Sequence, residues 1–289
     1  MPRRRAAPMS RSSRPGRTKS RKARRRRFHF PRLWPGARAS AFRALRAAPL
    51  VLQLVVGAIV SVGLWAAANW AYHAIHKPTE LLFPLSSTLA KTPVETWREY
   101  EPHFRKYATA AIAPELLAAL AQVESAGNPL ALTYWQWHLT WHPFQLYRPA
   151  SSAVGMYQIT DATFVQTNRE CLYEPALPED DFMRALGFCW FDGLYARLVP
   201  SHAIELTASL LDRGVTSTLR RQRIAASTLQ HKQDLAAVIH LCGAGAGETY
   251  AKRGFRLTPG QRCGDHDVRA YLGRVNGMKR VFARLASES

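Results

Sequence analysis

The most constraining feature of the chain is a strongly apolar run of 23 residues without a charged side chain, from Leu50 to Tyr72. At about 1.5 Å per residue, a helix over this run is as long as a bilayer's hydrocarbon core is thick, about 30 Å. Trp65 and Trp70 lie near its C-terminal end, where aromatic side chains anchor a span at the membrane–water interface. The run therefore predicts a transmembrane helix over residues 49–73.

Positive charge is concentrated before this run. The chain has a net charge of +20, yet residues 1–46 contain 17 basic residues and no acidic one. Because basic flanks stay on the cytoplasmic side, we expect residues 1–48 to be cytoplasmic and the remainder to lie across the membrane. Without apolar periodicity, this arm is expected to be disordered and to contact anionic lipid. The remainder has a net charge of only +3, so no nucleic-acid partner is expected.

A cleaved signal peptide is the alternative interpretation, with Ala66–Ala68 as a small-residue cleavage site. The basic region and the apolar run are both longer than those of a signal peptide. We therefore favour a retained span.

All four cysteines follow the apolar run, and an even number beyond a membrane predicts disulfides in an oxidising compartment. Of the three possible connectivities we favour the one with two local disulfides, Cys171–Cys189 and Cys242–Cys263. The alternative is a zinc site, which would require thiolates to survive oxidation. That site would use His240, Cys242, Cys263 and His266.

The sequence after the run is predominantly helical in pattern. Residues 74–92, which are rich in proline and serine, predict a short stalk. One helix should begin at Pro114, present an apolar stripe and stop at Gly127. We expect one mostly α domain over residues 93–289, large enough for a single core. Further helices are predicted at 161–168 with Thr160 as its cap, at 201–213 between a Ser201 cap and Gly214, at 233–241 and at 268–285.

Glu124 is the candidate catalytic residue. It ends the apolar stripe of the helix that begins at Pro114, so its carboxylate should emerge where core meets solvent. Desolvation at such a place raises a carboxyl pKa and favours proton donation near neutrality. On the helix pattern alone, an ordinary surface or capping glutamate remains the alternative.

Two ordered motifs carry a family resemblance. Ile112–Pro129 reads IAPELLAALAQVESAGNP, and Ala153–Thr160 reads AVGMYQIT. Together they resemble the catalytic domain of the soluble lytic transglycosylase family, related to goose-type lysozyme, in which a helix-ending Glu-Ser precedes a Gly-Leu-Met-Gln-like turn. Residues 203–211 and 244–247 resemble a later helix and the end of a third motif. The resemblance covers roughly residues 105–255 and implies a lysozyme-like fold behind a single N-terminal transmembrane helix.

The resemblance implies an activity on the glycan strands of peptidoglycan, between N-acetylmuramic acid and N-acetylglucosamine, without cofactor or metal. Glu124 would protonate the glycosidic oxygen and then accept the proton of the muramic C6 hydroxyl, which closes a 1,6-anhydro ring. It also implies a bacterial inner-membrane protein with a periplasmic catalytic domain. Ser125 and Gln158 would orient the sugar, Gly155 would let the backbone approach the glycan, and Met156 and Tyr157 would line the groove.

Two departures from the family pattern stand out. Cys242-Gly243 occupies the place of the usual Tyr-Asn, so those substrate-contacting side chains are missing there. The aromatic stretch Tyr134–Tyr147 is inserted between the two motifs; its rings either stack on sugars or pack the loop onto the domain. Two other functions stay open: a muramidase with water held by Asp161 or Glu170, and a non-catalytic peptidoglycan-binding component of an envelope or secretion machine.

Overall fold

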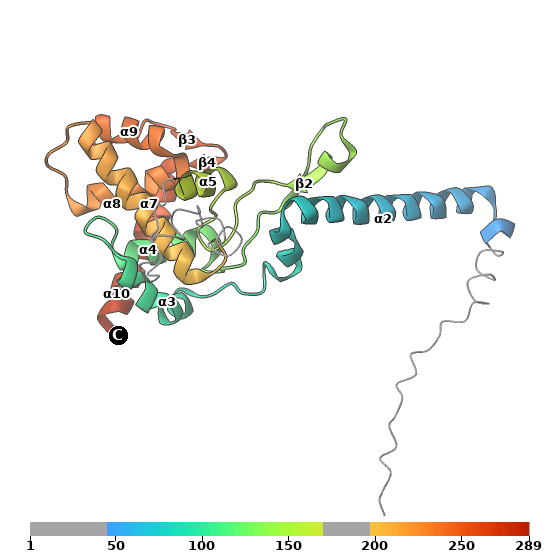
Figure 1. The fold of residues 1–289 in the computed structure, drawn as a ribbon, viewed down its shortest axis with the longest axis horizontal. Coiled ribbons are helices and arrows are strands. Elements are labelled where there is room, and N and C mark those ends of the chain that lie inside the picture. Colours follow the sequence, from blue (N-terminus) through green and yellow to red (C-terminus); the bar gives the residue numbers. More distant parts are fainter. Residues whose placement is uncertain (1–44, 170–196, 289) are drawn as a thin grey trace, which may run out of the picture. The chain divides into compact units, whose positions relative to one another are not determined.

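The computed structural model describes residues 45–169 and 197–288, and these are mostly helical (Figure 1). This confirms the predicted fold class. The chain divides into two units, residues 1–62 and 63–289, and the boundary falls inside helix α2.

Helix α2, Leu50–His76, contains the whole apolar run. Within the described ranges it is the one helix that is long and apolar enough to cross a membrane, and none of its apolar window is buried in the protein. The segment predicted as a stalk contains a short 3-10 helix, η1, over Pro78–Leu85. Its Glu80 is fully buried, pairs with Lys77 at 2.9 Å and accepts a hydrogen bond from the Trp135 indole at 3.2 Å.

Helix α3, Pro93–Tyr107, starts with a capping box. The Thr92 hydroxyl accepts the Glu95 N–H at 3.3 Å, and the Glu95 carboxylate accepts the Thr92 N–H at 2.7 Å. These two bonds satisfy backbone donors that a helix start leaves unpaired. The helix then buries Trp97, Tyr100 and Phe104 against the core.

Helix α4, Pro114–Ser125, is central to the core. Every residue from Leu116 to Ala121 is fully buried, because α3, α7 and the C-terminal helix α10, Val268–Glu288, pack around it. A helix that is apolar on all sides requires such complete enclosure. Ala118, Ala119 and Ala121 add little volume and let the neighbouring helices approach closely.

Three helices complete the domain: α7, Pro200–Arg221; α8, Leu229–Cys242; and α9, Ala244–Lys252. The prediction that a helix over 201–213 ends at Gly214 is wrong. Helix α7 starts with Pro200 and continues past Gly214 for two turns; Val199 occupies the N-cap position without a side-chain hydrogen bond, so Ser201 is not the cap. Gly214 lies inside α7 next to Ile239 of α8, where a Cβ would make an ordinary van der Waals contact at 3.4 Å, so the helix continues through it.

Strands are few and short in the described ranges. β1, Trp135–Trp137, pairs antiparallel with β2, Tyr147–Pro149, and the connection contains the 3-10 turn η2, Pro143–Gln145. We call residues 134–149 the aromatic hairpin. A second pair joins β3, Arg262–Cys263, to β4, His266–Asp267. Strands of two or three residues leave no alternating pattern that a sequence could reveal.

Candidate active site

The end of helix α4 presents Glu124 and Ser125. Ala126 adopts a left-handed conformation with φ 53°, and its N–H bonds to carbonyl oxygens of the preceding turn. Gly127 follows with φ 67° and donates to the Ala121 carbonyl at 3.0 Å. This turn is the helix stop that the sequence predicted, and it fixes the last helical turn, which carries both side chains.

Two side chains from other helices contact the Glu124 carboxylate. The Tyr271 hydroxyl, on α10, donates to Oε1 at 2.5 Å. Nε2 of His240, on α8, lies 3.5 Å from the same oxygen. The side chain of Glu124 is only 17% exposed to solvent and that of His240 only 11%, so the carboxylate is largely shielded from water.

These contacts lower the pKa of Glu124. Burial is the largest influence and raises the pKa, as the sequence predicted, but it is outweighed. The polar contact and charge of His240, the Tyr271 hydroxyl and the charge of His266 together hold this pKa below its ordinary value. The expectation of a raised pKa is therefore wrong for the unliganded protein, because the helix pattern revealed the desolvation but not the donors.

The same contact raises the pKa of Tyr271. Burial contributes most, followed by the negative charge of Glu124 and by the hydrogen bond to it. Tyr271 therefore remains protonated across the physiological range and acts as a hydrogen-bond donor to the carboxylate.

Ser125 joins helix α4 to the turn that contains the second motif. Its hydroxyl donates to the Met156 carbonyl at 2.9 Å. The Gln158 side chain joins its own turn to an earlier segment. Its Nε2 donates to the carbonyls of Gly155 at 2.9 Å and of Ala131 at 3.2 Å. In the structure these residues organise the turn beside Glu124, and their contact with sugar remains a proposal.

The prediction that Met156 and Tyr157 line the groove with their side chains is wrong. Both side chains are fully buried in the core, and the Tyr157 hydroxyl donates to the Leu117 carbonyl at 3.2 Å. Complete burial also raises the pKa of Tyr157. Both residues pack in the apolar core that contains α4, so they anchor the turn instead of lining a groove.

Gly155 is required by packing inside the protein. It is buried with φ 78°, and a Cβ there would clash with the Arg197 carbonyl oxygen. The observed partner of Gly155 is thus the Arg197 backbone, and its predicted approach to the glycan stays a prediction.

The cysteines of the zinc alternative are bonded to each other. Cys242 and Cys263 form a disulfide, which confirms that predicted pair, and their sulfurs are not available as thiolate ligands. His240, one of the two histidines of the zinc alternative, faces Glu124 instead. Cys171 and Cys189 lie outside the described residues.

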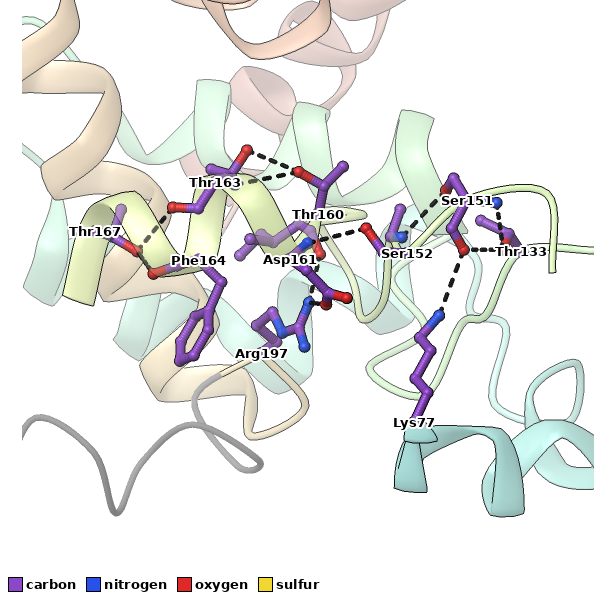
Figure 2. Close-up of polar contacts among 12 residues, drawn as sticks. Lys77, Thr133, Ser151, Ser152, Thr160, Asp161, Thr163, Phe164, Thr167 and Arg197 are labelled. Carbon is purple, nitrogen blue, oxygen red and sulfur yellow. Dashed lines mark hydrogen bonds and ion pairs between the residues drawn. The ribbon is translucent and has the colours of Figure 1, made fainter. Parts of the chain in front are cut away.

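Asp161 is the first residue of helix α5, Asp161–Arg169, and its polar groups are bonded to neighbouring side chains (Figure 2). Its carboxylate accepts a charged hydrogen bond from Arg197 at 2.6 Å, and its N–H donates to Ser152 at 3.0 Å. The Thr160 hydroxyl accepts the Thr163 N–H at 3.3 Å, as predicted for a cap. Asp161 thus balances Arg197 and the positive helix start. Glu170, the other candidate for holding water, lies outside the described residues.

Sequence reasoning missed the two partners of Glu124. Tyr271 is one aromatic residue in an amphipathic helix, and nothing in its local pattern distinguishes it from a core residue. His240 was noticed only as a possible metal ligand. His240 lies in the last turn of α8, two residues before Cys242-Gly243, which replaces the family's usual Tyr-Asn. This position was the signal that could have linked it to the site.

A comparison with known families matches part of the chain. Residues 102–228 match the family model described as the Transglycosylase SLT domain. The matched region contains α4, the second motif and all of α7, and it is similar to this lysozyme-like domain, whose family members are peptidoglycan lytic transglycosylases. The match ends before α8 and α10, which supply His240 and Tyr271. A comparison with curated proteins finds no match.

Proposed function

We propose that the protein is a membrane-anchored lytic transglycosylase that cleaves peptidoglycan between N-acetylmuramic acid and N-acetylglucosamine. The observation that carries this proposal is the setting of Glu124. The Glu124 carboxyl group lies in the last turn of a helix whose middle is fully buried, within the region that matches the Transglycosylase SLT domain; Tyr271 donates a hydrogen bond to it and His240 faces it.

The reaction uses Glu124 twice. The protonated carboxyl donates its proton to the glycosidic oxygen as the bond from the muramic C1 to that oxygen breaks. The resulting carboxylate accepts the proton of the muramic C6 hydroxyl, whose oxygen forms a bond to C1. A 1,6-anhydro ring results, no water is consumed, and the carboxyl group regains its proton.

The lowered pKa of Glu124 favours the second half of this cycle, in which the group is a carboxylate. The first half requires the protonated form. A glycan that fills the site removes the remaining water from a carboxylate already mostly shielded, and desolvation favours the neutral acid. Substrate binding thus supplies part of the shift that proton donation needs.

Ser125, Gly155 and Gln158 belong to the wall that receives the sugar, and the buried Met156 and Tyr157 anchor the turn of this wall in the core. The bond between the Ser125 hydroxyl and the Met156 carbonyl keeps this wall at a fixed distance from Glu124. A rigid wall is what the reaction needs, since the C6 hydroxyl must lie close to both C1 and the carboxylate.

Helix α2 anchors this domain in the bacterial inner membrane, with the basic arm in the cytoplasm and the catalytic domain in the periplasm. Support comes from the length and apolar character of α2 and from the charge that precedes it. The Cys242–Cys263 disulfide is consistent with an oxidising compartment. The tether restricts cleavage to glycan near the membrane.

The test is mass spectrometry of purified peptidoglycan after digestion with the detergent-solubilised full chain. We expect anhydromuramyl products from wild type and from Glu115→Gln, a control at the other end of α4. Glu124→Gln should be slower by about 10²-fold or more, as expected for loss of general acid–base catalysis. Products with a reducing muramic end would identify a muramidase instead. Glycan binding without any product would identify a non-catalytic component.

A further inference from the structure

The aromatic hairpin does not pack its tip onto the catalytic domain. Leu139 and Trp141 are fully exposed, and Trp137 and Tyr134 are each about two-thirds exposed, at 69% and 67%. From Tyr134 to Tyr147 the chain has no Lys, Arg, Asp or Glu. Such a concentration of uncharged, exposed aromatic and aliphatic side chains indicates an interaction surface.

The base and one side of the hairpin are attached to the C-terminal part of helix α2. Trp65, Asn69 and His73 lie on one face of α2 at four-residue intervals. Each donates a side-chain hydrogen bond to a hairpin carbonyl: Trp65 to Pro143 at 3.1 Å, Asn69 to Tyr147 at 2.7 Å and His73 to Phe144 at 2.8 Å.

Ring contacts follow the same side of the helix. Trp65 stacks on Trp137 with centroids 5.8 Å apart, and Tyr72 stacks on Phe144 at 5.2 Å. At the hairpin base, Lys77 donates to the Ser151 carbonyl at 3.4 Å (Figure 2). The hairpin is therefore held along this part of α2 over several turns.

These contacts determine the depth of the hairpin when α2 crosses a bilayer. Trp65 precedes Tyr72, the end of the apolar run, by seven residues, which is about 10 Å along a helix axis. A hairpin stacked on Trp65 consequently reaches about that far below the end of the run. Asn69 and His73 satisfy hairpin carbonyls that would otherwise have no partner away from water.

We propose that the aromatic hairpin inserts into the periplasmic leaflet beside α2 and forms a second membrane contact of the protein. Trp137 then lies at the level of Trp65, and the exposed Leu139 and Trp141 offer further apolar surface to the lipid. This contact adds a second attachment point to the one that the helix provides. The inference rests on the proposed membrane anchoring.

The test measures tryptophan quenching by brominated lipids in vesicles of phosphatidylcholine and phosphatidylglycerol that contain the full chain. The emission of one tryptophan is obtained by subtracting the emission spectrum of its Trp→Phe variant from that of wild type. Trp141→Phe reports the hairpin, Trp70→Phe reports α2, and Trp97→Phe is the control for a ring buried in the core at 4% exposure. We expect Trp141 to emit at shorter wavelength than a hydrated indole and to lose most of its emission, as Trp70 does, while Trp97 loses little.

Quenching of Trp70 without quenching of Trp141 would overturn the hairpin inference and leave the anchor intact. Absence of quenching at both would contradict the anchoring itself, and the inference with it. A Trp141 that brominated lipid leaves unchanged but added chitooligosaccharide quenches would identify the hairpin as a sugar platform, which also overturns the proposal.

Discussion

The Tyr271 hydroxyl donates a 2.5 Å hydrogen bond to Oε1 of Glu124, although the two residues are 147 positions apart in the chain. Helices α4 and α10 pack against each other in the core, and this packing brings the two side chains together. Tyr271 lies outside the region that matches the family model, so the candidate site extends beyond residues 102–228.

Tyr271→Phe should lower kcat/KM by about tenfold, because a hydrogen bond to a charged group contributes roughly 1.5–3 kcal/mol. The change removes the donor that orients the carboxylate and leaves the ring in place. Rates of anhydromuramyl product release measure the effect. Tyr250→Phe is the matched control, since Tyr250 is also a buried tyrosine and packs against Phe255. Equal rates for Tyr271→Phe and wild type would remove Tyr271 from the site.

His240→Ala should shift the pH dependence of kcat/KM. Proton donation needs protonated Glu124, so kcat/KM falls as pH rises above the Glu124 pKa of the free protein. His240 lowers that pKa, while burial raises it. Its removal therefore raises the pKa, and the falling limb moves to higher pH.

The control for this shift is His231→Ala, because His231 lies on the same helix and stacks on Phe255 instead. Its profile should match that of wild type. A falling limb that stays at the same pH in His240→Ala would show that His240 does not set the ionisation of Glu124.

Gly155→Ala should destabilise the protein by about 2 kcal/mol or more, through a left-handed alanine and a clash with the Arg197 carbonyl. Thermal unfolding measures the loss. Gly273→Ala is the control and should have the opposite effect. A Cβ there meets nothing within 4 Å, and alanine inside helix α10 should raise the free energy of unfolding by about 0.5–1 kcal/mol. An unchanged melting temperature for Gly155→Ala would contradict the packing argument.

The double variant Cys242→Ser/Cys263→Ser should lose about 3 kcal/mol of unfolding free energy, given the 21-residue separation of the two cysteines. The bridge links the end of α8, which carries His240, to the segment that leads into α10. We therefore expect reduced activity as well. Urea unfolding at neutral pH measures the stability, and a midpoint equal to that of wild type would contradict a structural role for the bridge.

Local patterns predicted a large part of the fold. The apolar run gave α2, and the stripe from Pro114 with its stop at Gly127 gave α4 nearly to the residue. Thr160 was identified as a cap because capping involves only neighbouring residues. The prediction for Gly214 was wrong, since a glycine that ends a helix and one that lies inside a helix look the same in sequence.

The sequence by itself determined that Glu124 ends a buried helix, that Cys242 can pair with Cys263, and that an apolar run precedes a mostly helical domain. These properties depend on spacing along the chain. The tertiary structure decided that Tyr271 and His240 contact Glu124 and lower its pKa, that Met156 and Tyr157 are core residues, and that the aromatic hairpin lies along α2. Those outcomes depend on which distant helices share one core, because hydrogen bonds and charges act over a few ångströms of space, whatever the separation in sequence.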